Sequence, residues 1–369
     1  MALLLLAGLS ATPVDQIYLT VSYCPTPFKG EGAVVHISGT DASFKIEHRF
    51  SLPDAVLGCP MNEDVTFVSD AHRRPQRTLG LRGRTTHLSW STGWGRLTLV
   101  DLDSGRVHEA KGSSTSGDLF DGLTSFAVAD ASGRTNVGLS PHVTADGFCD
   151  DGCFRLGHQD VKSGAFTGLP ALPFRATQTS VSYHDLSRGV YYAQGSYPLT
   201  KDARCDADDT TSCLFAINST SGALLSSHPL PTFQVYRYAD QPVSADGTVL
   251  AWGFGFQDVC NRTLDSYAFA RVHLASATAT RVACIDEEKA TIHKSPEMGA
   301  FSSDASRFAF ATGDSVETGL RQLIVFDTAT GAVLLNSKLD GLPKALGVSP
   351  IAPFFAIWGL AHMPAEGEE

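Results

Sequence analysis

Charge is scarce in this sequence, and most of it is negative. Asp, Glu, Lys and Arg make up 18% of the 369 residues, with 28 basic and 39 acidic side chains and a net charge of −11. Proteins that bind nucleic acid present a basic surface to the phosphates, so this balance argues against a nucleic-acid partner. The apolar fraction of 43% is typical of a folded chain rather than a disordered one.

Long apolar runs and long helical patterns are also missing. No stretch is long enough to cross a bilayer as a helix. No segment of more than about ten residues has the periodicity of an amphipathic helix, which disfavours a βαβ fold. The apolar run at residues 2–9 is followed by the small residues Ser10 and Ala11. We therefore predict a signal peptide over residues 1–11, with a buried N-terminal segment as the alternative.

Cysteine usage favours an oxidising compartment. The eight cysteines suggest pairing of sequence neighbours, which would join Cys24 to Cys59, Cys149 to Cys153, Cys205 to Cys213, and Cys260 to Cys284. A zinc site is disfavoured because CxxC spacing is absent, while free buried thiols remain an alternative. Two N-glycosylation sequons begin at Asn218 and Asn261. We expect a secreted protein or one in the lumen of the secretory pathway.

A hairpin pattern recurs along the chain. Its best copy has the apolar run 323–326, a turn from Asp327 to Gly331, and a second apolar run at 332–335. Weaker copies precede it, and three of them also carry Gly late in the turn, where a positive φ is cheap. The six predicted hairpins are 34–50, 97–110, 154–169, 214–230, 269–285 and 323–339. Their spacing of roughly 53 to 63 residues is slightly above that of propeller blades.

A second unit lies between these hairpins. It reads as a small or apolar strand, a turn with Asp, and an alternating strand, at 126–140, 181–195, 243–255 and 301–313. Distorted copies occur at 65–81 and 348–359. The turn residues Asp130, Asp185, Asp246 and Asp304 are best explained as Asx-turn formers that bind their own backbone. A catalytic role for them is the less favoured alternative.

Two alternating hairpins per unit predict an all-β fold. We expect a six-bladed β-propeller of four-stranded antiparallel blades, with seven blades as the alternative. The chain starts with a strand at 16–23 and ends with a strand pair at 345–361, so we expect the N- and C-terminal strands to share a blade and close the ring. Residues 16–361 would form a single domain, with a frayed tail at 362–369.

The repeat resembles those of the YVTN and quinoprotein-like, or WD40-like, β-propellers. Residues 325–336 (VFDTATGAVLLN) and 243–252 (VSADGTVLAW) carry the resemblance best. It implies the propeller fold and transfers no catalytic residue. The four tryptophans lack the blade period of quinoprotein dehydrogenases, so no cofactor is predicted.

Three groups of residues depart from the repeat and are candidates for a site. Trp90 and Trp94 lie in a Gly- and Ser-rich loop and could stack on sugars or peptides. A dense basic stretch could face an anionic ligand, through Arg73, Arg74 and Arg77. An acidic loop offers oxygen ligands for calcium, from Asp206, Asp208 and Asp209, although its spacing matches no standard calcium loop. The alternatives are a solvated or salt-bridged blade edge for the arginines and an acidic surface loop held by disulfides for the aspartates.

No motif for chemistry accompanies these groups, since GxSxG, HExxH, the P-loop and the dinucleotide fingerprint are absent. We therefore predict a monomeric binding module for a protein or glycan ligand, without catalysis. The alternatives are a metal-dependent hydrolase of lactonase type and a quinoprotein-like oxidoreductase. A lactonase-type site would need acidic residues on the innermost strands, and the predicted ones are mostly small and neutral.

Overall fold

The computed structural model describes residues 16–363 with gaps. The longer gaps are residues 52–63, 84–95, 111–134, 199–212, 236–245, 255–266, 286–297 and 313–321. The predicted signal peptide at residues 1–11 lies outside the described residues.

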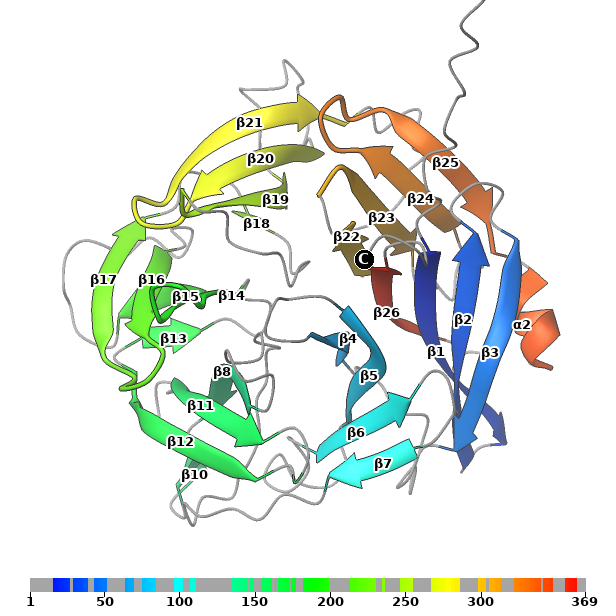
Figure 1. Cartoon of the computed structure of the whole chain (residues 1–369), viewed down its shortest axis with the longest axis horizontal. Coiled ribbons are helices and arrows are strands. Elements are labelled where there is room, and N and C mark those ends of the chain that lie inside the picture. Colours follow the sequence, from blue (N-terminus) through cyan, green and yellow to red (C-terminus); the bar gives the residue numbers. More distant parts are fainter. Residues whose placement is uncertain are drawn as a thin grey trace, which may run out of the picture.

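The described strands form six sheets of three to five strands, arranged around a common centre (Figure 1). We number these sheets in chain order. The first sheet contains both ends of the chain and has the order β26-β1-β2-β3. Its strands are β1 (Gln16–Thr26), β2 (Lys29–Ser38), β3 (Phe44–Ser51) and β26 (Ala356–Met363).

The second sheet has the order β4-β5-β6-β7. Its strands are β4 (Asp64–Ser69), β5 (Pro75–Gly83), β6 (Arg96–Asp101) and β7 (Val107–Ala110). The third sheet has the order β12-β11-β8 and consists of β8 (Thr135–Pro141), β11 (Phe154–Asp160) and β12 (Phe166–Ala171). The short strands β9 (Val143–Thr144) and β10 (Gly147–Phe148) pair with each other.

The fourth sheet has the order β13-β15-β16-β17, and β14 also pairs with β15. Its strands are β13 (Phe174–Ala176), β14 (Ser182–Asp185), β15 (Val190–Pro198), β16 (Cys213–Asn218) and β17 (Leu224–Pro229). The fifth sheet runs in order through β18 (Gln234–Val235), β19 (Thr248–Phe254), β20 (Tyr267–His273) and β21 (Thr278–Cys284). The sixth runs through β22 (Met298–Phe301), β23 (Arg307–Thr312), β24 (Gln322–Asp327) and β25 (Val333–Lys338).

All six predicted hairpins are present as antiparallel pairs. They are β2–β3, β6–β7, β11–β12, β16–β17, β20–β21 and β24–β25. Each forms the outer half of its sheet, and the strand of the second unit precedes it, as in β23–β24. The third strands β16, β20 and β24 are buried nearly throughout because sheets cover both of their faces, which explains the continuous apolar run of β24.

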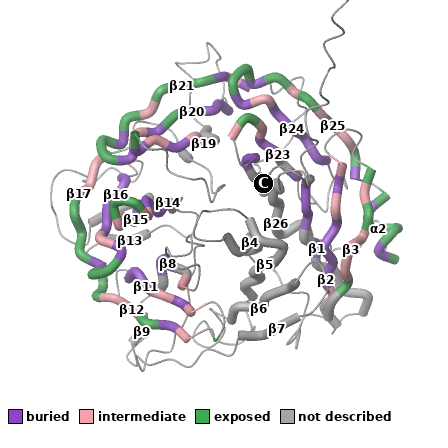
Figure 2. The backbone as a smooth tube through the Cα atoms, in the orientation of Figure 1, coloured by how far each residue is buried: buried purple, intermediate pink, exposed green. Residues whose placement is uncertain are grey.

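The core lies between successive sheets. Figure 2 shows buried residues along the middle strands and exposed residues along the outer strands β17 and β21. Between the fifth and sixth sheets, Phe269 makes edge-on contacts with Phe301, Phe308 and Phe326 at centroid distances of 6.0, 5.7 and 6.2 Å. Each fully buried aromatic or aliphatic side chain contributes about 1.5–3 kcal/mol. Packing between sheets therefore stabilises sheets that could not cover their own faces.

The two chain ends meet in the first sheet, as predicted. β1 pairs with β26 from Gln16 opposite Met363 to Ser22 opposite Ala356. Of the strand pair expected at residues 345–361, the structure describes one strand, β26, and residues 348–355 lie outside the described residues. β26 also includes residues 362 and 363, which the sequence analysis assigned to a frayed tail.

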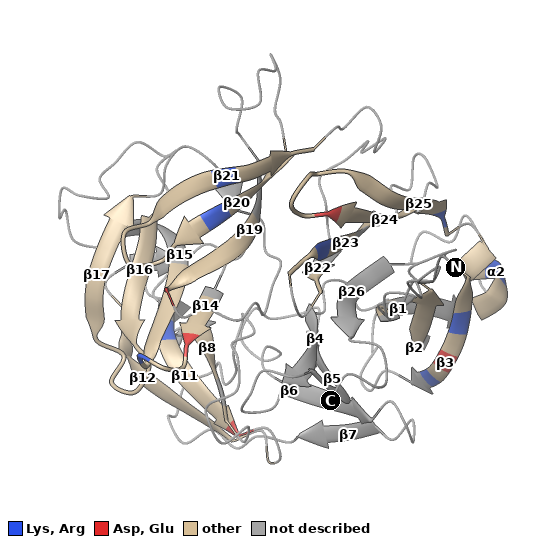
Figure 3. Ribbon diagram, turned by 45° about the horizontal axis from the view of Figure 1, so that its top comes forward, with Lys and Arg blue, Asp and Glu red and all other residues tan. Residues whose placement is uncertain are grey.

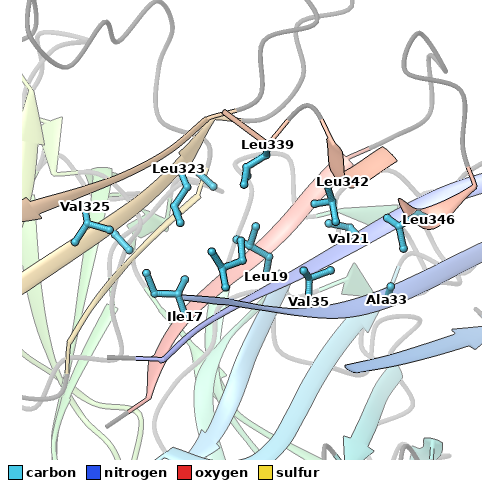
Figure 4. Close-up of a cluster of buried hydrophobic side chains, with 13 residues drawn as sticks. Ile17, Leu19, Val21, Ala33, Val35, Leu323, Val325, Leu339, Leu342 and Leu346 are labelled. Atoms are coloured by element: carbon cyan, nitrogen blue, oxygen red, sulfur yellow. The ribbon is translucent and has the colours of Figure 1, made fainter. Parts of the chain in front are cut away.

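The predicted strand at residues 345–350 begins instead within a helix, α2 (Gly341–Leu346). Pro343 lies in its first turn, where proline is tolerated, and Gly347 follows it with a φ of 76°. Leu342 and Leu346 face the sheet one helical turn apart and join a cluster with Val35 and Leu323 (Figure 4). The helix thus covers the junction of the first and sixth sheets.

This arrangement is that of a β-propeller, and the predicted fold class is confirmed. The number of blades and the closure of the ring stay predictions because residues 111–134 and other connections lie outside the described residues. Among the residues that the structure describes, no helix is long and apolar enough to cross a membrane.

Candidate functional site

Of the binding residues predicted from the sequence, only Arg77 lies on a described strand. Arg73 and Arg74 lie outside the described residues, in the connection before β5, and Arg77 belongs to β5. Trp90 and Trp94 also lie outside the described part, in the connection from β5 to β6. The acidic loop of Asp206, Asp208 and Asp209 precedes β16 and is not described either. All of these assignments stay predictions.

Three of the eight cysteines lie on described strands. Cys24 belongs to β1, and Cys213 begins β16 with no exposed surface. Cys284 ends β21 and is half-buried. Cys213 and Cys284 are disulfide-bonded. The connectivity of these two cysteines stays a prediction, as it does for Cys24, Cys59, Cys149, Cys153, Cys205 and Cys260.

Two of the four predicted turn aspartates, Asp185 and Asp246, form turns as predicted, while Asp130 and Asp304 lie outside the described residues. Asp185 Oδ1 accepts hydrogen bonds from Ser187 Oγ at 2.6 Å and from the Arg188 backbone N–H at 3.1 Å. Asp246 Oδ1 accepts from the backbone N–H and the hydroxyl of Thr248, at 3.1 and 2.7 Å. These are Asx-turn contacts in which the carboxylate replaces a backbone acceptor.

Asp185 also forms an ion pair within its own turn, in which its Oδ2 lies 3.0 Å from Arg188 Nη1. The same nitrogen packs against Gly247, the residue before β19, since a Cβ added to Gly247 would lie 2.7 Å from it. Burial alone would raise the pKa of Asp185, but the hydrogen bonds from Ser187 and Arg188 and the positive charge of Arg188 hold that pKa below its ordinary value. Asp185 is therefore a charged structural group at neutral pH rather than a proton donor. Figure 3 shows the acidic end of β14 in this position.

The outer hairpins share a second kind of turn. Its first residue accepts hydrogen bonds from groups two or three residues later. Asp160 Oδ1 binds the N–H and hydroxyl of Ser163, both at 2.6 Å. Asp327 Oδ1 binds the N–H and hydroxyl of Thr330, at 2.8 and 2.6 Å. These bonds, chiefly the one from the Thr330 hydroxyl, lower the pKa of Asp327.

Asn218 occupies the equivalent position in the fourth sheet. Its Oδ1 accepts hydrogen bonds from the backbone N–H groups of Thr220 at 3.0 Å and Ser221 at 2.8 Å. The turn ends in Gly222, whose φ is 73°, as the turn of the sixth sheet ends in Gly331 with a φ of 72°. The structure thus places a glycosylation candidate in a repeated turn.

The fifth sheet carries a variant of this turn that the sequence analysis missed. His273 takes the first position, and its Nδ1 lies 2.8 Å from Ser276 Oγ. Ala277 takes the glycine position with a φ of 53°. The available signal was the spacing alone, since Ala277 follows His273 by the same four residues that separate Gly331 from Asp327.

The turn from Asn218 to Gly222 packs against the neighbouring third sheet. A Cβ placed on Gly222 would lie 2.9 Å from Leu169 Cβ in the third sheet. The adjacent carbonyl of Ser219 lies 2.9 Å from His158 Nε2, also in the third sheet. The glycine is needed both for its φ and for this close approach. The turns therefore hold successive sheets together.

Buried polar side chains form a further group that the sequence analysis did not identify. His184 on β14 is 3% exposed and lies beside the Tyr191 ring at a centroid distance of 6.1 Å. The Arg155 guanidinium carbon lies 5.2 Å from the centre of the Phe166 ring, a cation–π contact. Burial raises the pKa of Tyr183, so its phenol stays protonated. These groups are enclosed by the sheets and do not form a surface site.

Comparison with known proteins finds similarity to solved structures only. No protein-family model and no curated protein matches this chain. Solved structures similar to it include a periplasmic gluconolactonase from Pseudomonas aeruginosa, with 14% identity over 95% of this chain and 99% of that one and a TM-score of 0.48. A hypothetical selenium-binding protein from Sulfolobus tokodaii has 12% identity over 90% and 76% of the two chains and a TM-score of 0.47. A putative TolB from Agrobacterium tumefaciens has 9% identity over 95% and 99% and a TM-score of 0.44.

These neighbours are β-propeller proteins. The class assigned to this chain rests on its own sheet order and on the pairing of its first and last strands. None of the neighbours' activities is carried over, because folds of this kind support many unrelated functions.

Proposed function

We propose that this protein is a secreted β-propeller that binds a protein or glycan ligand through loops that depart from the repeat. The observation that supports this proposal is the use of the repeated aspartates in turns. The carboxylate accepts a local hydrogen bond in each of Asp160, Asp185, Asp246 and Asp327. The described repeat therefore acts as scaffold, which leaves the irregular loops to provide function.

The topology separates the two binding candidates of the second sheet. Arg74 directly precedes β5, whereas the connection with Trp90 and Trp94 follows the end of β5. β5 spans residues Pro75–Gly83, so its ends are roughly 27 Å apart at about 3.3 Å per residue. We therefore treat the tryptophans and the arginines as two separate binding elements, with the arginines before and at the start of β5 in the sequence and the tryptophans after it.

The binding proposal is tested with a panel of immobilised neutral and sulfated glycans and a panel of extracellular proteins. The double variant Trp90→Ala/Trp94→Ala should weaken binding by tenfold or more if these rings are anchors. The triple variant Arg73→Ala/Arg74→Ala/Arg77→Ala should weaken the binding of anionic ligands and should reduce the dependence of that binding on salt. Arg271→Ala, an exposed arginine on β20, is the matched control.

Metal analysis of the purified protein distinguishes binding from hydrolysis. Stoichiometric calcium together with turnover of a lactone would contradict the binding-only proposal and favour a metal-dependent hydrolase. A protein that retains no member of either panel would contradict it as well.

Export is proposed on the apolar segment at residues 2–9, the cysteine content and the sequons. The disulfide-bonded states of Cys213 and Cys284 accord with an oxidising compartment. We propose the pairs Cys205–Cys213 and Cys260–Cys284, which peptide mapping under non-reducing conditions would identify. Recovery of both cysteines as free thiols from the cytosolic fraction would contradict export.

A further inference from the structure

We infer that Asn218 is an N-glycosylation site that shields the outer edge of the fourth sheet. This inference rests on the export proposed above and goes beyond it, because it assigns a modification to one residue. The acceptor sequence is Asn218-Ser219-Thr220. The structure supplies three independent observations that favour this asparagine.

The first observation is how the Asn218 amide is held. Its Oδ1 accepts the backbone N–H groups of Thr220 and Ser221, while no hydrogen bond of the described residues uses its Nδ2. Asn218 itself is half-buried at the end of β16, and the following Thr220 and Ser221 are exposed. The atom that would carry the sugar is therefore unengaged, and the atom that stabilises the turn would stay unchanged after modification.

The second observation concerns the hydroxyl that completes the sequon. Thr220 is exposed, and no described hydrogen bond uses its hydroxyl. By contrast, Thr330 in the turn of the sixth sheet gives its hydroxyl to Asp327 at 2.6 Å. The turn at Asn218 thus needs neither the Nδ2 nor the Thr220 hydroxyl for its own stability. Equivalent positions in the other described turns are held by Asp160, His273 and Asp327, which cannot accept an N-linked sugar.

The third observation is the strand beside the turn. β17 is the outer edge of the fourth sheet and carries no Lys, Arg, Asp or Glu. It begins with Leu224 and Leu225, which are 38% and 54% exposed. The outer strand β3 instead carries Lys45, Glu47 and Arg49 (Figure 3). Charge commonly protects exposed sheet edges from pairing with other chains, and a glycan at Asn218 would protect β17 in its place.

The modification itself is a group transfer from a lipid diphosphate oligosaccharide. The Asn218 Nδ2 forms a bond to the anomeric carbon of the first sugar, and the bond from that carbon to the diphosphate oxygen breaks. The lipid diphosphate leaves with the bonding electron pair, and the amide loses one proton to a base of the host transferase. No oxidation or reduction takes place.

The experiment expresses the full chain in cultured animal cells and maps glycopeptides by mass spectrometry after treatment with N-glycosidase. Asn218→Asp keeps the Oδ1 acceptor, matches Asp160 and Asp327, and should lose one glycan while its thermal unfolding matches that of the enzymatically deglycosylated wild type. Thr220→Ala should lose the same glycan with Asn218 intact, and Thr220→Ser should retain it. Asn261→Gln removes the second sequon and should leave the glycan at Asn218 in place.

Protease protection in the same cells reports export separately. A translocated protein with a glycan at Asn218 that both Asn218→Asp and Thr220→Ala remove supports the inference. A translocated protein with an unmodified Asn218 overturns the inference and leaves the proposed export standing. A protein that stays in the cytosol overturns both.

Discussion

Gly331, at the end of the β24–β25 turn, packs against the carbonyl oxygen of Cys284 at the end of β21. A Cβ on Gly331 would overlap that oxygen, and Ala283 Cβ would lie 3.5 Å away. The sixth sheet thus touches the backbone of the fifth at this point, as the Gly222 turn of the fourth sheet touches the third. These contacts set how closely neighbouring sheets approach.

Substitution of Gly331 should therefore be much more damaging than its φ alone would suggest. Gly331→Ala should cost about 1–2 kcal/mol for the left-handed backbone and more for displacing a backbone carbonyl that cannot move away. Gly347→Ala is the matched control, since Gly347 has a φ of 76° and no atom within 4 Å of a Cβ. Urea unfolding gives both free energies. Equal losses in the two variants would contradict the contact between the sheets.

At Ala277 we expect the opposite change, from alanine to glycine, to be tolerated. It is buried with a φ of 53° at the position that glycine holds in the other turns. Ala277→Gly relieves about 1–2 kcal/mol of strain and loses roughly 0.8 kcal/mol of methyl burial, so stability should change by less than about 1 kcal/mol. Ala270→Gly, at a buried strand position of the same cluster, should be clearly destabilising by calorimetry. A loss at Ala277 as large as that at Ala270 would contradict this interpretation.

The predictable part of the fold is the part encoded locally. The hairpin from 323 to 339 is determined by its own residues, because Asp327 and Gly331 specify the turn and the flanking apolar runs specify the strands. The turn role of Asp185 could be predicted for the same reason. The pairing of β1 with β26 followed from the mismatch between the two ends of the repeat.

The part that could not be predicted depends on contacts between distant segments. Helix α2 forms where a strand was expected because Leu342 and Leu346 pack into a buried cluster with side chains of the first and sixth sheets, and Arg49 binds its C-terminal end. His273 and Ala277 replace the usual turn residues, and only the structural alignment of the turns reveals them. The candidate binding loops belong to no repeat, so neither periodicity nor turn chemistry constrains them.

Acid should weaken the fold partly through Asp185. Its pKa in the folded protein lies below the unfolded value of about 4, so its contribution is fully present above pH 4 and is lost as the pH falls through the folded-state pKa. Asp185→Asn keeps the shape but loses the charge that pairs with Arg188. The variant should be less stable than wild type at pH 6, and the difference should shrink toward pH 2 in chemical unfolding. A constant difference across that range would rule out the charged form as the cause.

Arg49 should stabilise the junction of the first and sixth sheets. Its guanidinium donates to the carbonyls of Ala345 and Leu346, at 2.9 and 3.0 Å, and so binds the C-terminal end of α2. Arg49→Ala should lower the free energy of unfolding by roughly 1–2 kcal/mol. Lys45→Ala, four residues earlier on β3, removes only an exposed pair with Glu47 and should change stability by less than about 0.5 kcal/mol. Hydrogen exchange of residues 341–346 should increase in the first variant alone.

The exposed leucines of β17 should make the unglycosylated chain prone to association. Leu225 is 54% exposed on an edge strand without charge, and Leu334 is 53% exposed on β25, which carries Lys338. Because charge on an edge opposes pairing with other chains, Leu225→Lys should raise the temperature at which heated protein begins to scatter light. Leu334→Lys, which adds the same charge to an edge that already has one, should raise it less. The advantage of Leu225→Lys should disappear in protein that carries a glycan at Asn218, because the sugar would already cover this edge, and an advantage that persists in glycosylated protein would show that the glycan does not reach β17.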